Sequence, residues 1–94
     1  MIVAGTSLVV SPANSVVCEV PTACVRLIVN KERVGQDLGV QYGACAERDV
    51  WSGEISCDEA FLELIKLLGW EEKLRKVRDF LPESNRELLK AHGL

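Results

Sequence analysis

Four cysteines are the side chains in this sequence best suited to redox, nucleophilic or metal chemistry. They stand at Cys18, Cys24, Cys45 and Cys57, and no two are as close as the two to four residues that usually separate paired zinc ligands. The first ten residues lack the basic start of a secretory signal. We therefore expect a cytoplasmic protein whose thiols are free, because disulfides are uncommon in a reducing compartment. Two disulfides or a metal site are the less favoured alternatives.

A cysteine nucleophile would need a general base beside it, and His92 is the only histidine. It precedes Gly93 at the expected end of a helix, where a partly cationic imidazole is favourable, and nothing in the spacing brings it to a thiol. The sequence contains no GxSxG or HExxH motif and no glycine-rich phosphate loop. These absences favour a protein that is not an enzyme, with no catalytic residue, no metal and no cofactor.

The basic residues gather in one segment, Lys73, Arg75, Lys76 and Arg78. A helix, a glycine turn and a second, basic helix over 71–81 would suit a helix-turn-helix DNA reader. However, Glu71 and Glu72 each stand four residues before one of these bases. This spacing favours ion pairs within the helix, on a face exposed to solvent. The whole chain has a net charge of -3, which is unusual for a protein that grips nucleic acid. Nucleic-acid binding is therefore the alternative hypothesis, and an acidic protein partner is a third.

Two tryptophans are the remaining candidates for a binding surface, because tryptophan is enriched at interaction hot spots. Trp51 lies in the segment that connects the two halves of the chain and could instead pin that segment to the core. The predicted partner-binding residues, all assigned from type and position alone, are Trp51, Trp70, Lys73, Arg75, Lys76 and Arg78.

The elements that must position these residues differ between the two halves. Residues 1–53 hold most of the glycines and valines, and period-two alternation predicts strands over 16–20, 24–29 and 38–44. Ile2-Val3 and Leu8-Val9-Val10 supply one or two shorter strand pieces. Residues 30–33 suit a hairpin connection. The strand over 38–44 would have one face bare because of Gly39 and Gly43, which suggests either a twisted strand or close approach by a ligand.

Residues 56–92 show helical periodicity with well-marked ends. Ser56 and Glu59 form a capping box ahead of an apolar stripe that ends at Leu68, and Gly69 is placed as the left-handed residue that closes the helix. A second helix over 71–81 stops before Pro82. Ser84 and Glu87 predict a second capping box for a third helix, which ends at Gly93.

These patterns predict an α+β fold in one domain over 1–94: a small, mainly antiparallel sheet in 1–53 packed against a three-helix segment in 56–92. No apolar run approaches the roughly 20 residues that span a membrane. The preferred function is a small non-catalytic protein–protein interaction module that also self-associates, because the chain is apolar for its size. A nucleic-acid-binding regulator using helix 71–81, and a small-ligand domain or enzyme subunit using the strand over 38–44, are the alternatives.

Overall fold

The computed structural model describes residues 1–94, which form two compact units. We call Met1–Phe61 the N-terminal unit and Leu62–Leu94 the C-terminal unit, and each is described by itself. The prediction of a single domain over 1–94 stays a prediction.

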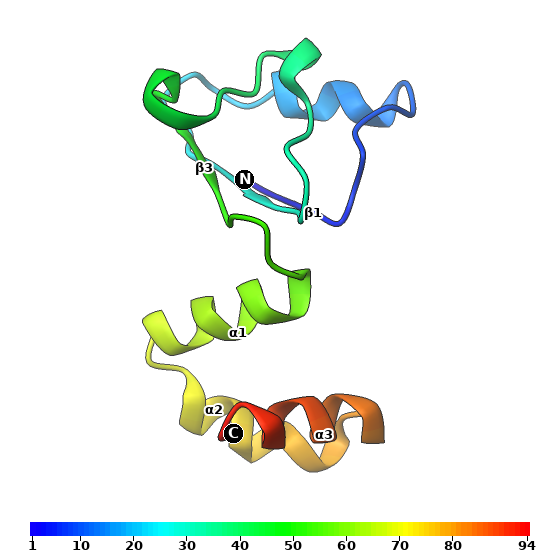
Figure 1. The fold of residues 1–94 in the computed structure, drawn as a ribbon, viewed down its shortest axis with the longest axis vertical. Helices are drawn as coiled ribbons and strands as arrows, with labels where there is room; N and C mark the ends of the chain where they lie inside the picture. Colours follow the sequence, from blue (N-terminus) through cyan, green and yellow to red (C-terminus); the bar gives the residue numbers. More distant parts are fainter. The chain divides into compact units, whose positions relative to one another are not determined.

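The N-terminal unit is built on three short strands, β1 (Ile2–Ala4), β2 (Arg26–Val29) and β3 (Asp49–Trp51), in the order β1-β2-β3. All pairings are parallel, with Val3 opposite Ile28 and Ile28 opposite Trp51. The segments that connect the strands lie on one side of them in Figure 1.

The predicted antiparallel sheet is therefore wrong, and the fold is of the α/β class with an all-parallel sheet followed by helices. Residues 30–33 do not turn the chain back as a hairpin. They begin a long connection through η2 (Gln36–Leu38) and η3 (Gly43–Cys45), both 3-10 helices, which returns the chain to start β3 in the same direction as β2. A parallel pair needs such a crossover of a dozen residues or more.

Two of the predicted strands are replaced by 3-10 turns. Residues 16–20 fall largely within η1 (Ala13–Cys18), which buries Val17. Residues 38–44 are interrupted where Gly39 and Gly43 adopt φ values of 86° and 71°, a left-handed conformation that a strand does not contain. The glycine-lined strand proposed as a ligand surface does not exist. Alternation over five to seven residues is too short a signal to exclude consecutive turns.

The predicted strand over 24–29 is confirmed in position, but its burial does not alternate. As the central strand, β2 buries Arg26, Ile28 and Val29, as expected for a parallel strand covered on both faces. Ile28 is the most buried residue, and it packs with Val3 and Val17 in the core of this unit.

A buried ion pair joins the amino ends of β2 and β3. The Arg26 Nε and the Asp49 Oδ1 are 2.5 Å apart, and both side chains are almost fully buried, at 3% and 2% exposure. Arg26 also donates to the backbone oxygens of Val17 and Gly39, at 2.9 and 3.1 Å, and Asp49 accepts from the Gln41 amide at 2.8 Å. The pair therefore ties two strands to both connections between strands.

The ion pair shifts the pKa values of both partners. The hydrogen bond from Arg26 lowers the pKa of the Asp49 carboxyl, against the opposing effect of burial. The hydrogen bond to Asp49 raises the pKa of the Arg26 guanidinium. Both shifts favour the charged forms, so the native structure holds this pair ionised.

The first helix begins and ends where the sequence indicates. α1 (Cys57–Leu67) starts after Ser56, whose hydroxyl accepts from the Glu59 amide at 3.2 Å. It ends in a Schellman arrangement, because Gly69 has a φ of 70°, and the amides of Gly69 and Trp70 donate to Lys66 and Ile65. The predicted cap and the predicted glycine corner are confirmed.

The rest of the C-terminal unit consists of α2 (Glu71–Val77), η4 (Arg78–Phe80), a 3-10 helix, and α3 (Glu83–Ala91). The predicted capping box at Ser84 is wrong: α3 begins earlier, with Pro82 at its N-cap position, so Ser84 lies inside the helix. A second glycine corner at Gly93 is confirmed, with a φ of 76°. Leu62, Leu89 and Leu94 form the core of this unit.

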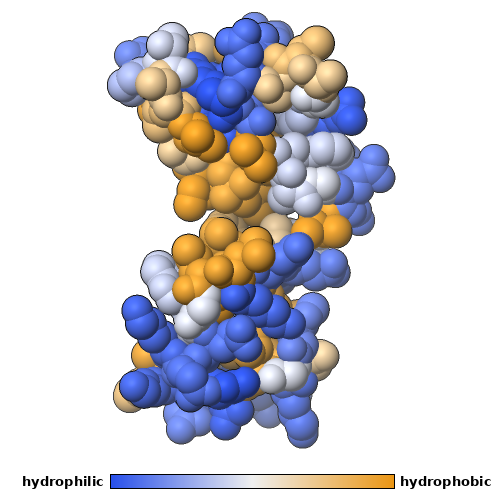
Figure 2. All heavy atoms as spheres, turned by 90° about the vertical axis from the view of Figure 1, so that its left-hand side faces the viewer, coloured by the Kyte–Doolittle hydropathy of each residue, from blue (hydrophilic) through white to orange (hydrophobic).

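Both units leave apolar side chains at the surface, and orange hydrophobic atoms are visible on each in Figure 2. The largest exposures are those of Phe80 at 88%, Leu67 at 79% and Val9 at 73%. None of the helices combines the length and the hydrophobicity that crossing a membrane requires.

We predict that Gly35→Ala destabilises the protein more than Gly39→Ala. Both glycines have a positive φ, which costs an alanine about 1–2 kcal/mol. A Cβ at Gly35 would also lie 2.8 Å from side-chain atoms of Leu8 and Val40, whereas a Cβ at Gly39 meets nothing within 4 Å. Overpacking should add about 1–3 kcal/mol at Gly35 alone. Urea unfolding followed by circular dichroism measures the difference, and equal losses for the two variants would contradict it.

We predict that Asp49→Asn costs about 3 kcal/mol, because it leaves a buried guanidinium without its counter-charge. The lowered pKa of Asp49 means that its contribution is complete above the unfolded value of about 3.9 and is lost as the pH falls through the lower folded value. Between pH 7 and pH 2, the free energy of unfolding of the variant should therefore fall by less than that of the wild type. Asp79→Asn, at an exposed carboxylate, is the control and should behave as wild type in unfolding measured from pH 7 to pH 2.

Candidate functional site at the carboxyl ends of the strands

The three parallel strands deliver their following loops to one edge of the sheet. β1 is followed by Gly5-Thr6-Ser7, β2 by Asn30-Lys31-Glu32 and β3 by Ser52-Gly53-Glu54. These loops carry hydroxyl, amide and carboxylate groups directly after the apolar residues that end each strand. In open α/β sheets, ligands bind in the crevice outside this edge.

The carbonyl oxygen of Val29, the last residue of β2, joins the end of this strand to the loop after β1 and to the start of α1. It accepts from the Gly5 amide at 3.0 Å and from the Cys57 thiol at 3.3 Å. A Cβ on Gly5 would lie 3.7 Å from the Cys57 Sγ, and Gly5 has a φ of 61°. Glycine at this position therefore lets the first loop turn beside the start of α1.

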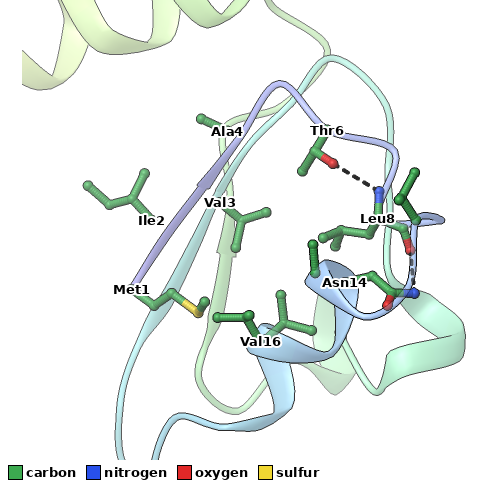
Figure 3. A pocket seen from close by; sticks show the side chains of 11 residues that line it. Met1, Ile2, Val3, Ala4, Thr6, Leu8, Asn14 and Val16 are labelled. Atoms are coloured by element: carbon green, nitrogen blue, oxygen red, sulfur yellow. Dashed lines mark hydrogen bonds between the residues drawn. The ribbon is translucent and has the colours of Figure 1, made fainter.

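The loop after β1 is internally braced. The Leu8 amide donates to the Thr6 hydroxyl oxygen at 3.1 Å, and the Asn14 side-chain amide donates to the Leu8 carbonyl at 3.3 Å (Figure 3). Leu8 itself takes a φ of 56°, which is rare for a residue with a branched side chain. The braces hold this conformation while Ser7 stays exposed.

A groove of about 280 Å³ runs beside β1 and ends at this loop. Figure 3 shows Met1, Val3 and Val16 around it, with Thr6 and Asn14 as the polar side chains in the lining. Concave, mainly apolar surfaces with a few placed polar groups are typical of small-molecule sites.

The loop after β2 borders a second, more polar hollow of about 440 Å³, lined by Lys31, Glu32, Arg33, Trp51 and Glu54. The Asn30 side chain donates to the Glu32 carbonyl at 2.9 Å, and the Trp51 indole N–H donates to the Asn30 carbonyl at 2.8 Å. Glu32 therefore lies in a loop that two hydrogen bonds hold in place, and the Trp51 side chain lines the same hollow.

Of the six residues predicted to bind a partner, the structure places only Trp51 at this edge. It ends β3, a strand that the sequence analysis interpreted as a connection, and its indole anchors the neighbouring loop.

The other five predicted residues lie in the C-terminal unit. The Lys73 ammonium stands 5.3 Å from the Trp70 ring centroid, Arg75 pairs with Glu72, and Arg78 donates to the Leu94 carbonyl at 3.2 Å. Lys76 is exposed. A partner-binding role for these six residues stays a prediction.

The four thiols lie in the N-terminal unit, and the single histidine, His92, lies in the C-terminal unit. All four cysteines are unbridged. Cys57 donates to Val29 in the N-terminal unit, whereas His92 caps α3 in the C-terminal unit and accepts at its carbonyl from Lys66.

The parallel order β1-β2-β3, the crossovers and the polar loops at one edge together define a Rossmann-like half-sheet. No family model matches the chain. The chain is 34% identical over 88 residues to the NAD-dependent protein deacetylase sirtuin-2 of Danio rerio, and 37% identical over 79 residues to the NAD-dependent protein deacetylase hst2 of Schizosaccharomyces pombe. It is also 32% identical over 77 residues to the NAD-dependent protein deacetylase hst2-2 of Emericella nidulans.

These similarities cover most of this chain but little of each relative. The matches include 82%, 83% and 82% of the chain, and the chain spans only 23%, 21% and 20% of the length of the respective relatives.

The comparisons correct the functional predictions made from the sequence. The preferred hypothesis of a non-catalytic protein–protein interaction module is wrong, and so is the inclination against an enzyme, because the chain resembles part of NAD-dependent deacetylases. The findings favour the alternative of a small-ligand domain or enzyme subunit. The ligand surface is not the segment 38–44 assigned to it, since that strand is absent.

A signal for this edge was present in the sequence. Ile2-Val3-Ala4 and Leu27-Ile28-Val29 are short apolar runs. Each is followed at once by glycine or polar residues, Gly5-Thr6-Ser7 and Asn30-Lys31-Glu32. Short apolar strands that are followed by polar residues at their carboxyl ends are typical of a parallel sheet. Alternation of polar and apolar residues does not reveal such strands, because a fully buried strand does not alternate.

Proposed function

We propose that this chain is the part of a NAD-dependent protein deacetylase that binds one nucleotide half of NAD, at the carboxyl edge of β1, β2 and β3. The observation that carries the proposal is the convergence of Gly5, Val29 and Cys57, which sets the loop after β1 beside the loop after β2. The relatives, which are NAD-dependent by name, support the choice of ligand.

The residues at this edge fit a nucleotide. Gly5 makes the tight turn that a bound pyrophosphate requires, and the Thr6 and Ser7 hydroxyls supply donors beside it. Glu32, just after β2, stands where Rossmann-like folds place the carboxylate that accepts from ribose hydroxyls. When bound, the dinucleotide would supply the chemistry on which deacetylation depends, and these residues would hold and orient it.

The loop departs from the common dinucleotide fingerprint in one respect. Gly5 is followed by Thr6-Ser7-Leu8, so the second and third glycines of G-x-G-x-x-G have no counterpart. Braced hydroxyl groups replace them here, since the Thr6 oxygen already accepts the Leu8 amide. We infer that Ser7, which is exposed and next to this brace, is the hydroxyl that contacts phosphate.

We also propose that the protein acts in the cytoplasm, which the four unbridged thiols support.

Exposed Phe80, Leu67 and Val9 support a further proposal, that the chain self-associates and contacts protein partners through apolar surface.

Titration calorimetry of the 94-residue chain with ADP-ribose tests the nucleotide site. We predict saturable binding to one site and a roughly tenfold weaker Kd for Glu32→Gln, because a hydrogen bond to a charged group contributes about 1.5–3 kcal/mol. Glu83→Gln, an exposed carboxylate on α3, is the matched control and should bind as wild type. Absence of binding by the folded wild-type chain would overturn the proposed function.

Sedimentation at micromolar concentration tests self-association. We predict a species heavier than the 10.4 kDa chain, and Phe80→Lys should shift it towards the monomer by placing a charge on the most exposed apolar side chain. A wild-type monomer throughout this concentration range would be incompatible with self-association.

A further inference from the structure

The loop after β1 contains a strained residue, Leu8. Its φ of 56° lies in the left-handed region, which a residue with a bulky side chain rarely adopts. Such a conformation persists only where the surroundings hold it, and strained residues of this kind gather at functional sites. Leu8 directly follows Ser7, the residue that we infer to contact phosphate. The groups that hold Leu8 therefore also determine where Ser7 lies.

Three contacts hold Leu8, and each engages a different part of the residue. The side chain is buried in the core with Val3 and Val17. The Leu8 amide donates to the Thr6 hydroxyl oxygen at 3.1 Å. The Leu8 carbonyl accepts from the Asn14 side-chain amide at 3.3 Å. Figure 3 shows both hydrogen bonds.

Asn14 is the hydrogen-bonding partner that ties Leu8 to a separate element, because it lies in η1. Its backbone amide also donates to the Val10 carbonyl at 3.0 Å, so Asn14 binds the loop at two points. η1 is itself fixed, since Val17 is buried and its carbonyl accepts from the Arg26 guanidinium at 2.9 Å. Asn14 therefore connects the phosphate loop to a segment that the buried ion pair holds in place.

Burial of the rest of the loop cannot replace this connection, because Val9 and Val10 are 73% and 70% exposed. We propose that Asn14 is a positioning residue for phosphate binding, which holds Leu8 in its left-handed conformation and thereby fixes Ser7 at the carboxyl edge of β1. A loop that is already held in its binding conformation loses less freedom when a ligand binds, which strengthens binding. The proposal rests on the proposed function above and adds a residue that need not touch the nucleotide.

The test is a pair of double-mutant cycles, measured by titration calorimetry of the full chain with ADP-ribose. Asn14→Ala removes the donor to the Leu8 carbonyl and should weaken the Kd about fivefold. In a Ser7→Ala background it should weaken the Kd by less than about twofold, because the hydroxyl that it positions is already absent. In a Glu32→Gln background it should again weaken the Kd about fivefold, because Glu32 lies in a different loop.

A merely structural role for Asn14 would give a different pattern. A generally loosened fold would weaken binding by the same factor in both backgrounds. Ser15→Ala is the matched control, because it removes a neighbouring hydrogen bond, of 2.6 Å from the Ser15 hydroxyl to the Pro12 carbonyl, and leaves the Asn14 side chain in place. This control should bind ADP-ribose as wild type, even where its free energy of unfolding is lower.

A measurement on the wild-type chain keeps the test decisive if Asn14→Ala fails to fold. Nitrogen-15 relaxation without ligand should show the Ser7 amide to be as ordered as the amides of β2, with an order parameter of about 0.85. A value below about 0.6 for Ser7 would overturn positioning by Asn14, because the loop would then not be held before the ligand binds.

The outcomes separate the two proposals. An unchanged Kd in folded Asn14→Ala, or an equal loss in the Ser7→Ala and Glu32→Gln backgrounds, overturns positioning by Asn14 while nucleotide binding stands. Failure of the folded wild-type chain to bind ADP-ribose overturns the proposed function and the positioning together.

Discussion

The buried ion pair between Arg26 and Asp49 is the interaction on which the N-terminal unit depends. Strands of three and four residues form few ladder hydrogen bonds, and an isolated sheet of this size is weak. Arg26 and Asp49 join the amino ends of β2 and β3, and their remaining hydrogen-bonding groups reach Val17, Gly39 and Gln41 in the two connections. Burying these charges is costly unless every donor and acceptor is used, and no buried side-chain nitrogen or oxygen is left without a partner. The same pair thus places the starts of β2 and β3 together.

Fixing the amino ends leaves the carboxyl ends free to carry function. The opposite edge of the sheet holds loops with exposed Ser7 and Glu32, and these are braced by local hydrogen bonds rather than buried. This division is physically reasonable, because polar groups that bind a ligand must be able to exchange their hydrogen bonds with water for hydrogen bonds with the ligand. Trp51 links the two roles: β3 positions it, and its indole N–H and ring face then hold the loop after β2.

Local signals predicted the helices well and the sheet poorly. The Ser56 cap and the Gly69 corner depend on contacts within five residues along the chain, and both are present as expected. A strand of three residues such as β3 is too short to show periodicity. Residues 38–44 alternate in sequence but form no strand, because Gly39 and Gly43 take positive φ values. Arg26 and Asp49, whose ion pair joins the starts of β2 and β3, are 23 residues apart, and no local pattern reveals that they pair. Of the candidate site residues, only Trp51 lies at the carboxyl edge of the strands, because the candidates were chosen for their residue type and not for their position at a strand end.

The central claim is that nucleotide binding takes place at the carboxyl edge of the three parallel strands. The most direct measurement is amide chemical-shift mapping of the 94-residue chain by nuclear magnetic resonance during titration with ADP-ribose. We expect the largest shifts in three separate segments, 5–8, 30–33 and 52–57. The amides of Arg26 and Asp49 at the opposite edge and those of 71–91 should change little. Shifts centred on the amino ends of the strands or on the C-terminal unit would contradict it.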